Sequence, residues 1–162
     1  MGHVPTPLVL LDVDGVINDL GHLYGHRRPW ETRVVEAGGF RVHIPDYMPY
    51  LIQSIASVAE IHWCTTWREN ANTEIAPVLG VGPFPVIDDG SDNQWIEWKA
   101  AAAYEVASHA IVRERRVIWI EDFYGELPHS KMPDGVEYVD TAVTPGGAVL
   151  TAELVPRGLV DG

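Results

Sequence analysis

Short apolar runs, each ending in polar side chains, recur along this chain. Continuous runs occupy residues 8–11 and 117–120, and shorter ones begin at Ile61 and Val136. Apolar runs of four to eight residues are typical of strands buried on both faces, as at the centre of a parallel α/β sheet. The pattern therefore predicts a parallel sheet whose strands cover residues 8–11, 61–67, 117–120 and 136–139.

Segments with helical spacing separate these runs. Residues 46–59 place apolar side chains at helical intervals, with Asp46 as the expected N-cap. Residues 95–108 predict an Ala-rich helix that carries Lys99, and residues 147–155 predict a weaker C-terminal helix. The order of elements predicts an α/β fold in which helices flank a central parallel sheet.

A β-hairpin is predicted soon after the first strand. The pair Gly38-Gly39 separates two runs of strand-forming residues, 33–35 and 40–44. A hairpin at this place in the chain can cover the carboxyl end of the sheet as a flap. Near its root stand three residues for which substrate contact and surface solvation are equally plausible: Tyr24, Arg27 and Arg28.

Composition narrows the class of protein. With 162 residues, 46% hydrophobic and 21% charged, the chain fits one globular domain over residues 1–162. The net charge of -12 argues against an extended footprint on a nucleic-acid backbone and favours a small substrate or a nucleic-acid end. No membrane span or export signal is visible, and the single cysteine forms no internal disulfide, so we expect a cytoplasmic location.

Two carboxylates and a glycine follow the first strand. Asp12 and Asp14 crowd one crevice, because the Asp14-Gly15 step predicts a turn there. Like charges so close are costly unless one is protonated or a cation lies between them, and Mg²⁺, before Ca²⁺, suits oxygen ligands. The alternatives are a solvated turn and a calcium loop, but the latter would need a ligand where Val16 stands.

Polar residues also follow the later strands. Thr65 and Thr66 precede a polar helix start at Arg68, where free amides would favour an anion, although Thr is also an ordinary strand and cap residue. Glu121-Asp122 follows the run 117–120 and repeats the placement after the first strand. A lone lysine on a helix is usually solvated, but the apolar neighbours of Lys99 favour a side chain that reaches the carboxylates.

Taken in order, Asp12-x-Asp14-Gly15, Thr65, Lys99 and Glu121-Asp122 resemble the four motifs of the haloacid dehalogenase superfamily. The resemblance extends from the first strand to about residue 122. The segments Trp-Cys-Thr-Thr-Trp and Trp-Ile-Glu-Asp are similar to those of small capless members, including the domain of Swiss-army-knife RNA repair proteins. This resemblance implies a Rossmann-like domain with the first strand central, a hairpin flap and no large cap.

The resemblance also implies an activity, Mg²⁺-dependent hydrolysis of a phosphomonoester through an aspartyl-phosphate. Asp12 would be the nucleophile and Asp14 the general acid and base, while Thr65 and Lys99 would contact the phosphoryl group. The implied substrate-binding residues are Gly15, Thr66 and Arg68. The implied metal ligands are Asp12, the Val13 carbonyl and Asp122, with Asp14 and Glu121 as further candidates.

Several alternatives stay open. Glu121 stands where the family often has aspartate, so either Glu121 or Asp122 could be the direct metal ligand. The presence of Asp14 favours phosphate chemistry over carbon-halogen cleavage. A non-catalytic domain that binds a phosphorylated ligand is the competing hypothesis, and the substrate would be a phosphorylated small molecule or a nucleic-acid end. Three residues are candidate platforms for stacking a base, with interior packing as the alternative: Trp30, Trp67 and Trp95.

Overall fold

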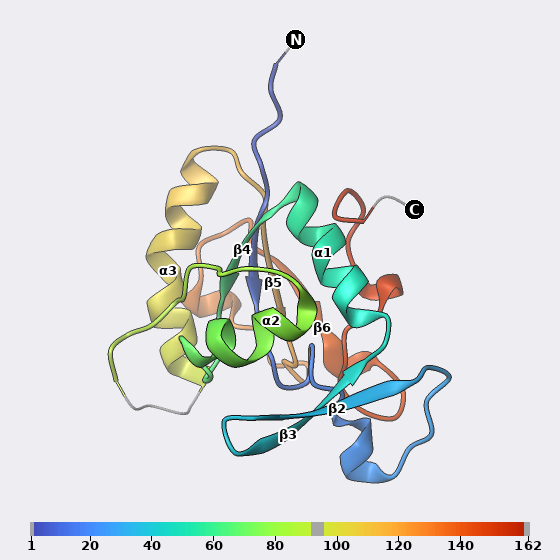
Figure 1. Ribbon diagram of the computed structural model, residues 1–162. Coiled ribbons are helices and arrows are strands. Elements are labelled where there is room, and N and C mark those ends of the chain that lie inside the picture. The colour runs from blue at the N-terminus through green and yellow to red at the C-terminus, as the bar shows by residue number, and fades with distance from the viewer. Residues whose placement is uncertain (1, 92–95, 161–162) are drawn as a thin grey trace.

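A central parallel sheet flanked by helices forms the body of the protein (Figure 1). The computed structural model describes residues 2–91 and 96–160. The strand order is β4-β1-β5-β6, which places β1 inside the sheet between β4 and β5. The strands are β1 (Leu8–Leu11), β4 (Glu60–Trp63), β5 (Val117–Glu121) and β6 (Glu137–Asp140). The predicted parallel sheet is therefore confirmed.

The two faces of the sheet have different covers, because side chains alternate along each strand. Val9 and Leu11 of β1 pack in one cluster with the buried side of α1 (Met48–Val58). Leu8 and Leu10 pack in another with α3 (Ile96–Val112), which contributes small side chains there. The buried alanines of α3 are Ala100, Ala103, Ala107 and Ala110.

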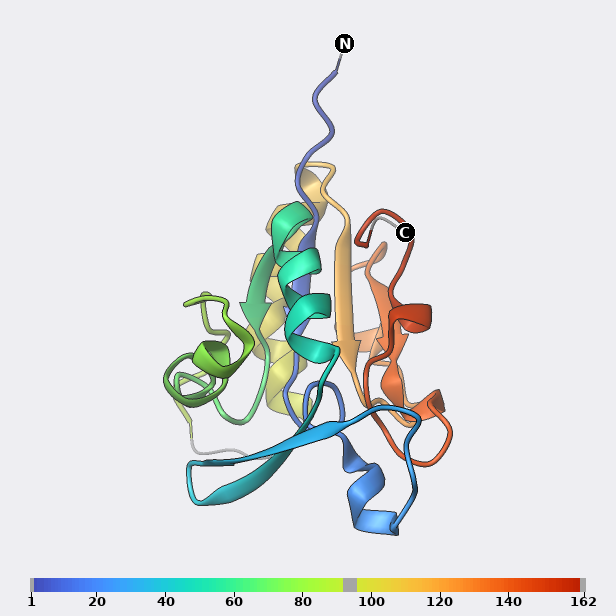
Figure 2. The same ribbon diagram turned by 45° about the vertical axis from the view of Figure 1, so that its right-hand side comes forward.

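The predicted hairpin is present, formed by β2 (Thr32–Ala37) and β3 (Phe40–Pro45), which pair antiparallel. Figure 2 shows it beyond the carboxyl ends of the central strands. Between β1 and this hairpin runs the short 3₁₀ helix η1 (Leu20–Tyr24), and α2 (Ala76–Leu79) follows a π-helical turn, Ala71–Ile75. The hairpin and the 3₁₀ helix η1 therefore follow β1 in the chain and precede α1.

Two predicted boundaries were wrong, and a third lies outside the described residues. Asp46 does not cap α1, because the N-cap is Tyr47 and makes no side-chain bond, and Pro49 in the first turn removes one amide that would need a partner. The strand predicted to reach Trp67 ends at Trp63. Trp95, where the Ala-rich helix was expected to begin, lies outside the described residues.

The weak helix predicted over residues 147–155 was also wrong. Val149 and Leu150 are fully buried, and the Leu150 amide donates to the Val16 carbonyl at 2.9 Å. The segment is therefore held against the loop after β1, and the short 3₁₀ turn Ala152–Leu154 follows. Among the described residues, no helix has the length and apolar character to cross a membrane.

Candidate metal and phosphate site

Three carboxylates converge where β1 and β5 end. One oxygen from each of Asp12, Glu121 and Asp122 lies within 4.8 Å of the others. Asp12 and Glu121 are 4% and 2% exposed, so these groups lie in the interior rather than on a solvated turn. Because β1 and β5 are neighbours in parallel register, with Leu11 opposite Ile120, residues far apart in sequence meet at one edge.

Lys99 reaches this cluster from α3, as its apolar neighbours in sequence predicted. Its Nζ lies 2.7 Å from Glu121 Oε1 and 3.4 Å from Asp12 Oδ1. The other oxygen of Glu121 accepts a hydrogen bond from the Trp119 indole at 3.1 Å. Trp119 and Glu121 are two apart on β5 and so share the face that α3 covers. Glu121 therefore has a donor on each oxygen and holds Lys99 in place.

Gly15 permits the close approach of Asp122. A Cβ added to Gly15 would lie 2.5 Å from Asp122 Oδ2, and its φ of +78° also favours glycine. The Gly15 carbonyl accepts a 2.5 Å hydrogen bond from the buried Thr141 hydroxyl. Gly15 thus lets the β1 turn pack directly on the Asp122 carboxylate, a role that its prediction as a substrate-binding residue did not include.

The charges of the cluster do not balance. Burial, together with the negative charge of Asp12, raises the pKa of Asp122 to about 7. Burial and Asp12 also raise the pKa of Glu121 well above its ordinary value. Burial alone would lower the pKa of Lys99, but the carboxylates of Asp12 and Glu121 raise it above its usual range. Three carboxylates thus share one ammonium group, and a divalent cation with oxygen ligands would supply the missing positive charge.

Asp14 lies outside this cluster, although it was a candidate ligand. Its Oδ1 accepts from the Asn18 amide at 2.9 Å, and its Oδ2 accepts from the Trp67 indole at 3.0 Å. Val13 was also a candidate, but its carbonyl accepts backbone hydrogen bonds from the next turn, at 2.8 Å from Ile17 and 2.9 Å from Asn18. These bonds close the turn, so the Val13 carbonyl is already engaged by backbone donors.

The threonines after β4 are placed differently from each other. Thr65 is fully buried, and its hydroxyl accepts from the Trp67 amide at 3.2 Å, in the cap-like manner of a strand-to-turn junction. Thr66 is half-buried. The Cys64 amide donates to the Leu11 carbonyl at 2.8 Å, so this turn starts beside the end of β1.

Two of the predicted arginines, Arg68 and Arg28, are engaged with the protein itself, whereas Arg27 is exposed. Arg68 pairs with Asp88 at 3.0 Å and Asp89 at 3.7 Å, and its guanidinium lies over the Trp98 ring. Arg28 pairs with the buried Asp19 at 2.6 Å, so neither substrate contact nor simple solvation describes it.

Asp19 is a structural anchor that sequence reasoning missed. Besides Arg28, it accepts hydrogen bonds from the Gly21 amide at 2.8 Å and the Trp30 indole at 3.2 Å. Asn18 and Trp67 were likewise not connected with Asp14. Asn18 closes the turn after Asp14, and Asp19 is the N-cap of η1. The proximity of both residues to Asp14 in sequence was the available signal, whereas the Trp67 contact had none.

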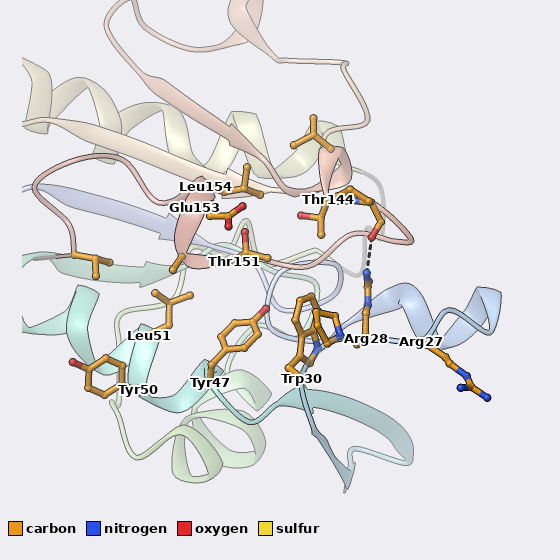
Figure 3. Close-up of a pocket in the computed structure, with 15 residues that line it drawn as sticks. Arg27, Arg28, Trp30, Tyr47, Tyr50, Leu51, Thr144, Thr151, Glu153 and Leu154 are labelled. Atoms are coloured by element: carbon orange, nitrogen blue, oxygen red, sulfur yellow. Dashed lines mark hydrogen bonds between the residues drawn. The ribbon is translucent and has the colours of Figure 1, made fainter. Parts of the chain in front are cut away.

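A large cavity lies elsewhere in the molecule (Figure 3). It has a volume of about 850 Å³ and lies between the start of α1 and residues 143–160. The rings of Trp30 and Tyr47 stand on one wall, with their centroids 5.2 Å apart, and Arg28 donates to the Pro145 carbonyl beside them. None of the clustered carboxylates lines this cavity.

No family model, curated protein or solved structure matches the chain. The geometry of the site itself is therefore the ground for a functional proposal.

Proposed function

We propose that this protein is a Mg²⁺-dependent phosphohydrolase of the capless haloacid dehalogenase type, which cleaves a phosphomonoester through a covalent intermediate on Asp12. The observation that carries the proposal is the convergence of Asp12, Glu121 and Asp122 with Lys99 at the carboxyl ends of parallel strands. Ligands of such sheets bind at that edge.

The residues present suit a magnesium ion. Asp12 and Asp122 would hold it, because Glu121 already has a donor on each oxygen. When bound, Mg²⁺ supplies positive charge that reduces the repulsion between a phosphoryl group and the carboxylates. Mg²⁺ keeps several waters and takes few protein ligands, so two carboxylates are sufficient.

The side chains divide the reaction into two displacements. An Asp12 oxygen attacks phosphorus, forming an acyl-phosphate bond, while the bond to the leaving oxygen breaks and Asp14 gives that oxygen a proton. Asp14 then takes a proton from a water that attacks the same phosphorus, which releases phosphate and restores Asp12. Lys99 stabilises the charge on Asp12 and on the phosphoryl oxygens throughout.

The substrate is a phosphorylated small molecule or the end of a nucleic acid. The hairpin lies beyond the strand ends, and the described residues form no separate cap domain over them, so a bulky leaving group has access (Figure 2). The net charge of -12 disfavours a long nucleic-acid footprint.

A phosphatase screen tests the proposal. The purified protein would be assayed with p-nitrophenyl phosphate, nucleotides, sugar phosphates and oligonucleotides phosphorylated at the 3' or 5' end, with Mg²⁺, with Ca²⁺ and with a chelator. We expect turnover with Mg²⁺, little with Ca²⁺ because its looser coordination misplaces the in-line geometry, and none with chelator.

The Asp12→Asn variant is the matched negative control, because the amide keeps the shape of the side chain but does not attack phosphorus. Full activity after exhaustive chelation, or in Asp12→Asn, would contradict the proposal. Tight vanadate binding by a protein that turns over none of the substrates would instead support a non-catalytic domain for phosphorylated ligands.

A further inference from the structure

The Asp14 carboxylate is fixed by two donors from separate segments. Asn18, in the turn after β1, donates to Oδ1 at 2.9 Å, and Trp67, in the loop after β4, donates to Oδ2 at 3.0 Å. A carboxylate bonded at both oxygens keeps one orientation, because rotation about its terminal torsion would break both bonds.

Both donors are in turn held by the hairpin. Asn18 Oδ1 accepts from the His43 amide of β3 at 2.9 Å. The Trp67 ring meets Phe40 edge to face, with centroids 6.2 Å apart. A Cβ on Gly38 would lie 3.4 Å from the same indole ring, so the hairpin turn rests on Trp67. Three residues of the hairpin thus contact the two groups that orient Asp14.

We infer that Trp67, together with Asn18, is a positioning residue for proton transfer by Asp14. The hairpin in turn sets the position of the Trp67 ring through Phe40. The inference rests on the proposed function, in which Asp14 protonates the leaving oxygen. A misdirected proton donor slows departure of a strongly basic leaving group more than that of a weakly basic one, since the latter leaves with little help.

The variant Trp67→Phe tests this directly, because it removes the indole N–H and keeps an aromatic ring against Phe40. Its kcat would be measured with phenyl phosphate, a poor leaving group, and with p-nitrophenyl phosphate, a good one. We expect kcat for phenyl phosphate to fall at least about tenfold more than kcat for p-nitrophenyl phosphate, with KM little changed.

Trp63→Phe is the matched control, since it removes an indole bond to Asn72 Oδ1, 2.8 Å long, that does not involve Asp14. It should lower the two rates by the same factor. An equal loss with both substrates in Trp67→Phe would overturn the positioning role while leaving the phosphohydrolase proposal intact. A wild-type protein that hydrolyses neither substrate would overturn both.

Phe40→Ala tests the link through the hairpin. Phe40 is 68% exposed, so its loss should not unfold the protein. We expect kcat for phenyl phosphate to fall more than kcat for p-nitrophenyl phosphate, but by a smaller factor than in Trp67→Phe. In the double variant, the selective loss should be smaller than the product of the losses in the two single variants. Val34→Ala, also exposed on the hairpin, is the control and should match wild type. Wild-type rates in Phe40→Ala would overturn the hairpin's part.

A measurement without turnover completes the test. The indole N–H resonance that disappears from the ¹H–¹⁵N spectrum of Trp67→Phe is that of Trp67. In Asp14→Leu this resonance should move, because the carboxylate acceptor is gone. An unmoved resonance would overturn the hydrogen bond on which the inference stands.

Discussion

Among individual side chains, Lys99 and Glu121 form a unit that differs in role from Asp122. Glu121 takes donors from Lys99 at 2.7 Å and from Trp119 at 3.1 Å, whereas Asp122 lies directly against the Gly15 turn. The strand ends at Glu121, so Asp122 is free of the alternation that turns Glu121 toward α3. Asp122 is therefore the stronger candidate for direct coordination.

Metal titrations of two variants separate these roles. Asp122→Ala should raise the Mg²⁺ concentration for half-maximal activity by at least about tenfold, because loss of a residue that merely supports a metal ligand already lowers metal affinity by about that much. Glu121→Ala should instead lower kcat with a smaller change in that concentration, because it frees Lys99. Glu121→Asp should be tolerated. A larger metal requirement in Glu121→Ala would show that the longer carboxylate is the ligand.

Sequence reasoning brought Asp12, Lys99, Glu121 and Asp122 together correctly, because strand ends and an apolar helix environment are local signals. The sequence predicted the Val13 carbonyl as a metal ligand, whereas in the structure this carbonyl accepts the hydrogen bonds that close the turn. The partner of Asp14, Trp67, could not be predicted, since the contact depends on how the loop after β4 folds over the β1 turn.

The elements around the site depend on a close fit between α3 and the sheet. The face of α3 toward the sheet carries alanines, including Ala103 and Ala107, both fully buried. Small side chains allow this helix to lie near β1 and β5, and Lys99 extends from its first turns to the carboxylates. The distance between α3 and the sheet thus affects both the stability of the protein and the position of Lys99 at the carboxylates.

Overpacking this interface has a predictable effect. Ala107→Leu should lower the free energy of unfolding by about 1–3 kcal/mol, since extra methylenes have no space against the sheet. Ala101→Leu, on the exposed side of the same helix, should change it by less than about 0.5 kcal/mol. Urea denaturation of both variants checks this, and equal losses would show that α3 does not pack as described.

Strands and the hairpin were predictable from local apolar runs and the Gly38-Gly39 pair. Residues 147–155 were not, because their apolar positions satisfy the spacing of a helix while Val149 and Leu150 in fact enter the core beside the β1 loop. Tertiary burial decided the conformation there, and no local signal indicated it.

For the protein as a whole, the buried carboxylate cluster links stability to pH. Burial, and then Asp12, raises the pKa of Asp122 to about 7. Its unfolded value is about 4, so the native state holds the proton more tightly. This contribution is complete below about pH 4 and is lost as the pH rises through about 7.

With chelator present, the free energy of unfolding should therefore fall between about pH 5 and pH 8, by on the order of 1 kcal/mol or more. Asp122→Asn removes the titrating group and should reduce that fall. Mg²⁺ at pH 8 should restore stability in the wild type, because a ligand of the native state stabilises it. Denaturant titrations at each pH give the slopes, and identical slopes in the wild type and in Asp122→Asn would contradict this view.

Trapping the covalent intermediate tests most directly whether Asp12 is the nucleophile. Asp14→Asn should slow hydrolysis of the intermediate by about 10²-fold or more, while p-nitrophenyl phosphate, whose leaving group needs little protonation, still phosphorylates Asp12. After acid quench with Mg²⁺ present, mass spectrometry should find one added phosphoryl group on the peptide that contains Asp12. Measurable p-nitrophenol release with no phosphoryl group on that peptide, or with the group on another residue, would contradict the account.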